Sequence, residues 1–188
     1  YQLSSESNAA GESVDPDNRM LWHAPVRRMD AEEIRDSVLW LAGKLDLKIG
    51  GKSFTELPDQ HFVGGRTVIG NLNRETNRRA AYMVRGYNST AEMMPNFFHV
   101  FDVDNGKLPS PVRNRSITAL QALTLMNSPL VEEAAKDFGR RLMKQTHDDL
   151  AQAIELGFKM ALSRAPTTAE GEGIRQHLKN CSGCDVSS

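Results

Sequence analysis

Apolar side chains recur at helical spacing along residues 29–45, which is the strongest helix signal in the chain. Asp30 precedes the run and Glu33 follows three residues later, so the two predict a capping box at the start of the helix. Arg35 and Asp36 fall outside the apolar stripe, and we expect both on the solvated face. The stripe that we expect to face the core consists of Ile34, Val38, Leu41 and Leu45.

A second helix is predicted at residues 116–126, where the sequence SITALQALTLM is apolar almost all round. A helix without a polar face is typical of the middle of a bundle, so we expect this one to be buried, with Ser116 as its N-cap. Shortly before it, Phe97, Phe98 and Phe101 fall in a short aromatic turn or helix. We expect these rings to anchor the core rather than to stack on bases or sugars.

Three more amphipathic helices are predicted towards the C-terminus. Ser128 followed by Pro129 is a favourable start for the first, and Thr146 is the predicted start of the second. Thr167 and Glu170 predict a capping box at the start of the third. Because the connections are short, we expect the helices to pack as antiparallel neighbours. Their predicted core faces are Leu130, Ala134, Phe138 and Leu142, then Leu150, Ile154, Phe158 and Ala161, then Ile174 and Leu178.

The remaining segments carry weaker patterns. Residues 1–14 are rich in Ser, Asn, Gly and Glu, which predicts an irregular lead-in. Pro16 suits the first turn of a short helix that would extend to Trp22. Residues 50–75 contain several glycines without a sustained period and predict a long surface loop, and the alternation at 78–87 predicts a short strand.

These elements predict a mainly α fold, a helical bundle of about five helices with long irregular loops, which allows a short β-strand or hairpin. We expect one helical domain at residues 15–180, after a lead-in at 1–14 and before a C-terminal tail at 181–188. A chain of 188 residues with 39% hydrophobic residues is long enough to bury a core.

The charge balance argues against binding to nucleic acid, and the absence of long apolar runs argues against a membrane span. Lys and Arg number 23 against 24 Asp and Glu, so the net charge of −1 offers no general attraction to nucleic acid or to an anionic membrane. No apolar run approaches the roughly 20 residues that a membrane span needs. We therefore expect neither nucleic-acid binding nor a membrane span.

Seven segments of the chain carry a family resemblance. In their order along the chain they resemble the DUF1553 domain, also called PSD1, of planctomycete-type exported multidomain proteins, and together they cover most of the sequence. They are YQLSS at 1–5, DPDNRMLW at 15–22, RRMDAEEIRDSVLWLAGKLDLKIGG at 27–51, RRAAYMVRGY at 78–87, FFHVFDVDN at 97–105, RNRSITALQALTLMNSP at 113–129 and ALSRAPTTAE at 161–170.

The resemblance implies a domain of unknown function that follows a DUF1549-like domain in a large exported protein. It implies that this preceding domain is the partner and that the protein lies in the periplasm or elsewhere in the exported cell envelope. The segments that normally open and close the domain are missing, so we expect it to be incomplete at both ends. Such proteins often carry a c-type cytochrome domain, and we expect haem c only in a separate domain of the parent, with no cofactor in this chain.

One group of residues has metal-ligand spacing. Cys181 and Cys184 form a CxxC pair, but Asp185 rather than His follows it, which excludes covalent haem attachment. With His177 four residues earlier, the cysteines supply three of the four ligands that a structural zinc site needs. We favour a local disulfide or two free thiols over zinc.

A set of arginines is a candidate binding site for anions. Guanidinium groups bind sulfate, phosphate and carboxylate in a bidentate manner, so clustered arginines could recognise an anionic polysaccharide. We favour the alternative that these arginines pair with the acidic side chains of the chain. The candidate anion site comprises Arg78, Arg79, Arg85, Arg113 and Arg115.

The leading functional hypothesis is a non-catalytic accessory or interaction module. The alternative is that the chain forms part of the active site of an envelope enzyme acting on polysaccharide, with Glu33, Asp36 or Asp102 as proton donor or base. Two carboxyl groups within about 5 to 10 Å in a concave pocket would favour the enzyme. Asp102 also begins the sequence DVDNG, which resembles a calcium loop in the wrong register, and we favour an Asx-rich turn there.

Overall fold

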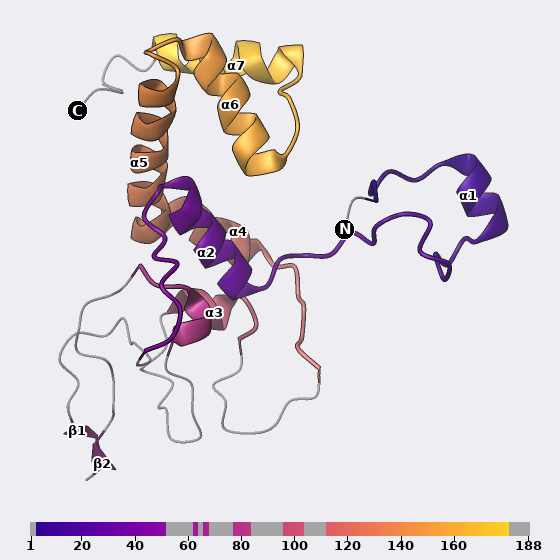
Figure 1. Cartoon of the computed structure of the whole chain (residues 1–188), viewed down its shortest axis with the longest axis horizontal. Helices are drawn as coiled ribbons and strands as arrows, with labels where there is room; N and C mark the ends of the chain where they lie inside the picture. Colours follow the sequence, from indigo (N-terminus) through magenta and orange to yellow (C-terminus); the bar gives the residue numbers. More distant parts are fainter. Residues whose placement is uncertain are drawn as a thin grey trace.

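The computed structural model describes residues 3–51, 62–63, 66–67, 77–83, 96–103 and 112–180, and this part of the chain is mainly α-helical, as the sequence predicts (Figure 1). A two-residue antiparallel pair joins strands β1 (Phe62–Val63) and β2 (Arg66–Thr67), and a 3₁₀-helix, η1, covers Ala80–Tyr82. The α-helices are α1 (Ala9–Val14), α2 (Ala31–Leu41), α3 (Asn96–Val100), α4 (Ala119–Asn127), α5 (Pro129–Gln145), α6 (Leu150–Leu162) and α7 (Thr168–Asn180).

Local capping signals place three of the helix starts correctly. The capping box predicted for α2 is present, with Asp30 and Glu33 each accepting a backbone N–H of the other. Ser128 is the N-cap of α5, and Pro129 is its first residue. At α7 the backbone N–H of Thr167 donates to Glu170 at 2.8 Å, and that of Glu170 donates to the Thr167 hydroxyl at 3.3 Å.

Two predicted helix starts are wrong. Thr146 ends α5, where its hydroxyl donates to the carbonyl of Leu142, and Asp149 caps α6 instead. Likewise Thr118, not Ser116, caps α4. In both cases another Thr or Asp lies within three residues of the predicted cap, and the sequence pattern alone does not choose between them.

The core lies between α2, η1, α3 and α4 and is built around aromatic rings. Phe97, Phe98 and Phe101 are all buried, which confirms their predicted role as core anchors. The ring centroids of Phe97 and Phe101 are 4.8 Å apart. Ala31, at the start of α2, is fully buried against this cluster, because its small side chain lets the helix approach the rings closely.

The buried face of α2 differs from the predicted one. The predicted stripe of Ile34, Val38, Leu41 and Leu45 is only half-buried, whereas Ala31, Arg35 and Leu39 are buried. Arg35 was predicted on the solvated face, but 1% of its surface is exposed. Its Nη1 donates to the carbonyl of Arg78 at 2.8 Å, a partner that lies 43 residues away and cannot be found from helical spacing.

The helix α4 is not buried as its sequence predicts. Gln121 is its buried residue, while Leu120, Leu123 and Met126 are exposed. Gln121 donates to the carbonyl of Val100 at the end of α3, and the half-buried Leu125 packs against the aromatic core, so this side of α4 faces the interior. The opposite side therefore presents apolar side chains to solvent.

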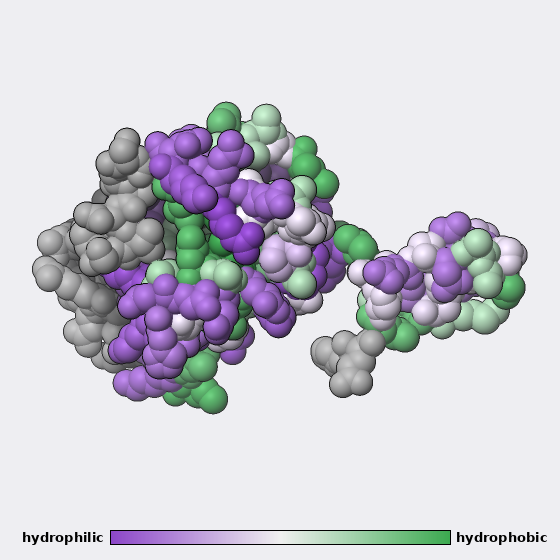
Figure 2. Space-filling view, turned by 90° about the horizontal axis from the view of Figure 1, so that it is seen from above, coloured by the Kyte–Doolittle hydropathy of each residue, from purple (hydrophilic) through white to green (hydrophobic). Residues whose placement is uncertain are grey.

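The three C-terminal helices surround an apolar hollow of about 410 Å³. Residues of all three predicted helix faces line it, including Phe138 of α5, Ile154 of α6 and Leu178 of α7, although Leu150 and Ala161 of the predicted α6 face are exposed. Seen from above, the molecule exposes hydrophobic residues (green) between hydrophilic ones (purple) (Figure 2). No helix of the described residues is long and apolar enough to traverse a lipid bilayer.

The N-terminal residues, which include α1, form a small lobe that stands apart from the other helices (Figure 1). The lead-in that was expected to be irregular contains α1, and the short helix expected after Pro16 is a series of turns. The Trp22 ring packs on Gly11, where an added Cβ would lie 2.5 Å from the ring. Asp15 is buried and accepts the backbone N–H groups of Arg19 and Met20, so the lobe has its own small core.

The strand predicted at residues 78–87 is wrong in its described part. Residues 80–82 form η1, an isolated parallel bridge joins Asp46 to Arg78, and Met83 also lies in an isolated bridge. Residues 84–87 and most of the long loop predicted at 50–75 lie outside the described residues. The division of the chain into a lead-in, one domain and a tail stays a prediction.

Candidate functional site

A cleft of about 780 Å³ runs along one side of α2. Asp30, Glu33, Ser37 and Trp40 are three or four residues apart, so they share one face of the helix and form the floor of the cleft. Ten residue steps of an α-helix make this floor roughly 15 Å long. The other lining residues are Arg27, Met29, Glu32, Asp36, Leu45, Leu47, Arg79, Ala81 and Arg113.

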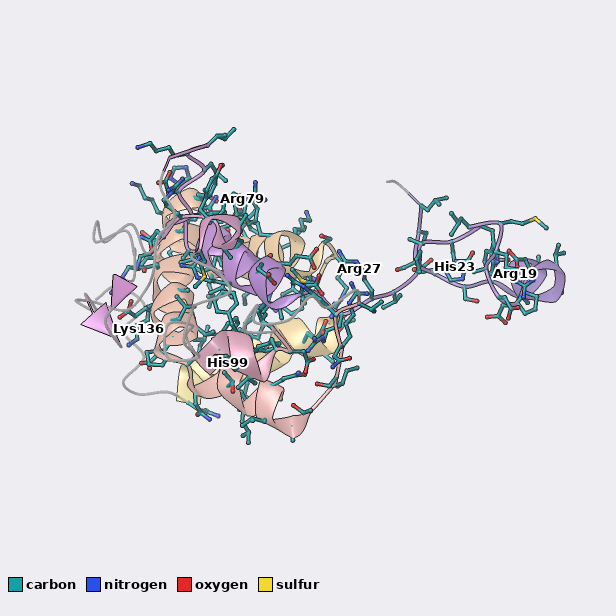
Figure 3. The ribbon with its side chains drawn as sticks, turned by 90° about the horizontal axis from the view of Figure 1, so that it is seen from below. Arg19, His23, Arg27, Arg79, His99 and Lys136 are labelled. Atoms are coloured by element: carbon teal, nitrogen blue, oxygen red, sulfur yellow. The ribbon has the colours of Figure 1, made fainter. Side chains whose placement is uncertain are left out.

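At the start of the cleft, Arg27 and Glu33 form a bidentate pair. The Nη1 and Nη2 atoms of Arg27 donate to Glu33 at 3.1 and 2.6 Å. These bonds, together with the backbone N–H of Asp30, lower the pKa of the Glu33 carboxyl. Arg27 lies where the chain arrives from the N-terminal lobe, which itself holds Arg19 and His23 (Figure 3).

The segment before α4 is tied to the same helix by two arginines. The Nη1 of Arg113 donates to Glu32 at 2.9 Å, and the Nε of Arg115 donates to Asp30 at 3.3 Å. Each partner is more than 80 residues away in the chain, so these contacts join α2 to a distant part of the sequence. Arg113 therefore places a guanidinium group beside a carboxylate at the wall of the cleft, while Arg115 binds Asp30 from outside it.

Asp36 is held farther along the same helix. It accepts the backbone N–H of Ala80 at 2.8 Å, and the Nε of Arg79 lies 3.7 Å from its carboxylate. The Nη1 of buried Arg35 approaches the same carboxylate at 3.6 Å. Asp36 thus fixes η1 against α2, which places Arg79 and Ala81 on the edge of the cleft.

The arginines predicted to bind an anion do not gather in one patch. Arg78 is buried, stacks on Tyr82 with its guanidinium 4.2 Å from the ring centroid, and donates to the carbonyl of Gly50. Arg79, Arg113 and Arg115 each face a carboxylate of α2. This arrangement favours the alternative of pairing with the acids of the chain, while anion binding by these residues stays a prediction. Arg85 lies outside the described residues.

Of the three catalytic candidates, Glu33 and Asp36 line the cleft and Asp102 does not. Asp102 follows α3 in a left-handed conformation, with φ of 62°. It accepts the backbone N–H of Ser116 at 2.8 Å and Nη2 of Arg28 at 3.0 Å. Burial raises the pKa of its carboxyl, but the bonds from Ser116 and the charge of Arg28 outweigh burial and lower it.

The metal candidates are only partly described. His177 lies in the last turn of α7, while Cys181 and Cys184 fall outside the described residues. Among the residues that the structure does describe, no three His, Cys, Asp or Glu side chains are grouped as metal ligands would be. The zinc and disulfide interpretations therefore stay predictions.

Trp40, which no sequence motif singles out, also lines the cleft. Trp40 is 46% exposed, and the guanidinium of Arg141, which does not line the cleft, lies 5.6 Å from its ring centroid. The Nη1 of Arg141 also donates to the Trp40 carbonyl at 2.8 Å. Trp40 stands between two leucines and so reads as a core residue, but its spacing from Glu33 and Ser37 places it on the polar side of α2.

Comparison with protein families confirms the resemblance found in the sequence. The model of the family described as PSD1, protein of unknown function (DUF1553), matches residues 1–178. Comparisons with curated proteins and with solved structures gave no match. The family match covers every residue discussed for the cleft and for α4.

Proposed function

The chain belongs to the PSD1 family of proteins of unknown function (DUF1553), and from that premise we propose that it is a non-catalytic helical module that docks onto a neighbouring domain. The neighbour is the preceding DUF1549-like domain of a larger, exported cell-envelope protein of the cytochrome-c-linked planctomycete kind that the sequence resembles. The module binds that domain by burying an apolar surface that is exposed on the module when the domain is absent.

The outer face of α4 carries this proposal. Leu120 and Leu123 are more than half exposed, and Met126 is 79% exposed. Helical spacing puts Leu123, Met126 and the exposed Ala119 on the side opposite the buried Gln121, with Leu120 and the exposed Ala122 at the two edges of this side. A contiguous apolar face of this kind on a soluble protein is typical of an interaction surface.

The pKa values of two candidate catalytic carboxyl groups support a docking module rather than an enzyme that transfers protons. A general acid at neutral pH needs a carboxyl whose pKa is raised towards 6 or 7, usually by burial. The pKa values of Glu33 and Asp102 are lowered, by Arg27 and by Ser116 with Arg28 respectively. Both groups therefore stay ionised and act as fixed hydrogen-bond acceptors.

One observation favours the alternative of an envelope enzyme acting on polysaccharide. Glu33 and Asp36 both face the concave cleft, as two catalytic carboxyl groups would. The enzyme hypothesis requires that the chain together with its neighbouring domain releases reducing ends from a polysaccharide, and that Asp36→Asn abolishes the release. The docking hypothesis expects no such release.

Docking is tested by placing a charge on the α4 face. The wild-type chain and its Leu123→Lys variant are titrated against the separately produced DUF1549-like domain of the same parent protein by isothermal calorimetry. Burying an unpaired ammonium in an apolar interface should weaken binding at least about tenfold. Leu3→Lys is the matched control, because Leu3 lies away from α4 in the chain and is 54% exposed against 53% for Leu123. Equal binding by the two variants, or no binding by the wild type, contradicts the proposal.

A further inference from the structure

We infer that the cleft along α2 is a binding site for a short neutral oligosaccharide, with Trp40 as the surface on which a sugar ring stacks. This site is separate from the docking face of α4 and does not depend on it. The inference rests on the shape of the cleft, on one exposed aromatic ring and on the pairing of its charged groups.

Trp40 is placed as a stacking surface rather than as a core residue. Nearly half of Trp40 is exposed, on a helix face whose other residues in the cleft, Asp30, Glu33 and Ser37, are polar. Arg141 contacts the ring by a cation–π interaction and bonds to the backbone carbonyls of Trp40 and Leu41, so the ring is supported without being covered. An indole presents a large apolar face with few rotatable bonds, which suits it to the C–H face of a sugar.

The walls of the cleft suit the hydroxyl groups of a sugar. Each hydroxyl both donates and accepts, so a sugar needs donors and acceptors side by side. Glu32 and Asp36 supply acceptor oxygens, and Arg113 and Arg79 supply N–H donors beside them. Both arginines are about half exposed, so each presents part of its guanidinium group to solvent at the cleft.

The balance of charge selects a neutral ligand over a charged one. The cleft is lined by Asp30, Glu32, Glu33 and Asp36 against Arg27, Arg79 and Arg113, while Arg115 binds Asp30 from outside the cleft. A sulfated or carboxylated ligand would compete with carboxylates for the same guanidinium groups. A cationic ligand would compete with the arginines in the same way, whereas an uncharged polyol adds hydrogen bonds without breaking a pair.

The test uses the fluorescence of Trp40 in the whole chain. The chain has two tryptophans, so a Trp22→Phe background leaves Trp40 as the only reporter. The probes are hexasaccharides of β-1,4-linked glucose, mannose and xylose, together with a sulfated galactose hexasaccharide, each at millimolar concentration. We expect at least one neutral probe to shift the Trp40 emission to shorter wavelength with saturation, because stacking removes the ring from water.

Variants separate stacking from folding. Trp40→Ala should weaken binding of that probe at least about tenfold by calorimetry, and Trp40→Phe by less, since a ring remains. Ser37→Tyr fills the middle of the cleft and should also abolish binding, which keeps the test valid if Trp40→Ala melts early. Lys136→Ala, on the exposed side of α5, is the control and should bind as the wild type does. No binding by any neutral probe, binding of the sulfated probe alone, or equal binding by Trp40→Ala overturns the inference.

Discussion

Arg35 carries a charge in the interior of the molecule, where 1% of its surface is exposed. Its Nη1 donates to the carbonyl of Arg78 and lies near the Asp36 carboxylate, so it joins α2 to η1. Arg35→Ala removes this link, leaves a cavity and strips the Arg78 carbonyl of a donor. We predict a loss of about 3 kcal/mol in the free energy of unfolding, measured by urea titration.

The control for Arg35 is an exposed arginine that also pairs with an acid. Arg140 on α5 is half exposed and donates to Asp137 at 3.1 Å. Arg140→Ala should change the free energy of unfolding by less than about 0.5 kcal/mol, because exposed ion pairs are worth little. A loss from Arg35→Ala as small as this would show that Arg35 is not a structural link.

Glu170 gives the chain a defined dependence on acid. Hydrogen bonds from Arg164, with a further one from the backbone of Thr167, lower the pKa of this carboxyl from 4.5 to about 2. Because the folded-state pKa lies below the unfolded one, the ionised pair stabilises the fold above about pH 4.5, and this contribution is lost as the pH falls towards 2. We predict that Glu170→Gln lowers the melting temperature of α7 at pH 6 and has no effect near pH 2.

Circular dichroism melts across this pH range measure the effect, and Arg164→Gln should reproduce it, since it removes the other half of the pair. A difference between wild type and Glu170→Gln that stays constant from pH 6 to pH 2 would contradict the assignment.

At the scale of residues, what the sequence predicted depended on how far away each partner lies. The box of Asp30 and Glu33 was readable because both members are within one turn. The burial of Arg35 could not be predicted from the local sequence, because its partner is the backbone of Arg78. The sequence pattern predicts Ser116 as a helix cap, but its hydroxyl donates to Asp102, whose proximity depends on the folding of α3.

Two glycines in neighbouring helices form a test of helix energetics. Gly139 lies inside α5, and a Cβ added to it would meet nothing within 4 Å. Gly157 lies inside α6, where an added Cβ would come within 3.1 Å of Leu142. We predict that Gly139→Ala raises the free energy of unfolding by roughly 0.5 to 1 kcal/mol, because alanine favours the helix.

Gly157→Ala is the matched control, and its gain should be smaller because Leu142 must move. Chemical denaturation of the two variants measures the difference. A larger gain for Gly157→Ala than for Gly139→Ala would mean that α5 and α6 are packed differently from the structure described.

At the scale of elements, the sequence predicted helices better than it predicted their surroundings. The faces of α5, α6 and α7 were found from spacing, since each follows a regular stripe. The exposure of α4 could not be predicted from spacing. An apolar helix has the same sequence pattern whether it is covered by other helices of the bundle or by another protein. The alternation at residues 78–87 predicted a strand, yet η1 forms at residues 80–82, where α2 binds the backbone through Asp36 at Ala80 and through Arg35 at Arg78.

At the scale of the whole molecule, the chain combines a helical body with a small N-terminal lobe (Figure 1). The mainly α class and the family followed from the sequence, because both depend on patterns spread over most of the chain. The charged cleft was only partly predictable. Its carboxylates and arginines were singled out, but Trp40 and the pairing of each arginine with α2 depend on contacts between distant segments.

The most direct test of the account is hydrogen–deuterium exchange of α4 in the chain alone and in the presence of the DUF1549-like domain of the same parent. If α4 docks there, the backbone amides of residues 119–127 exchange more slowly in the complex, while those of α6 are unchanged. Leu123→Lys should remove this protection. Unchanged exchange of α4 in the presence of the domain, or protection that persists in Leu123→Lys, would contradict the proposal that this face is the docking surface.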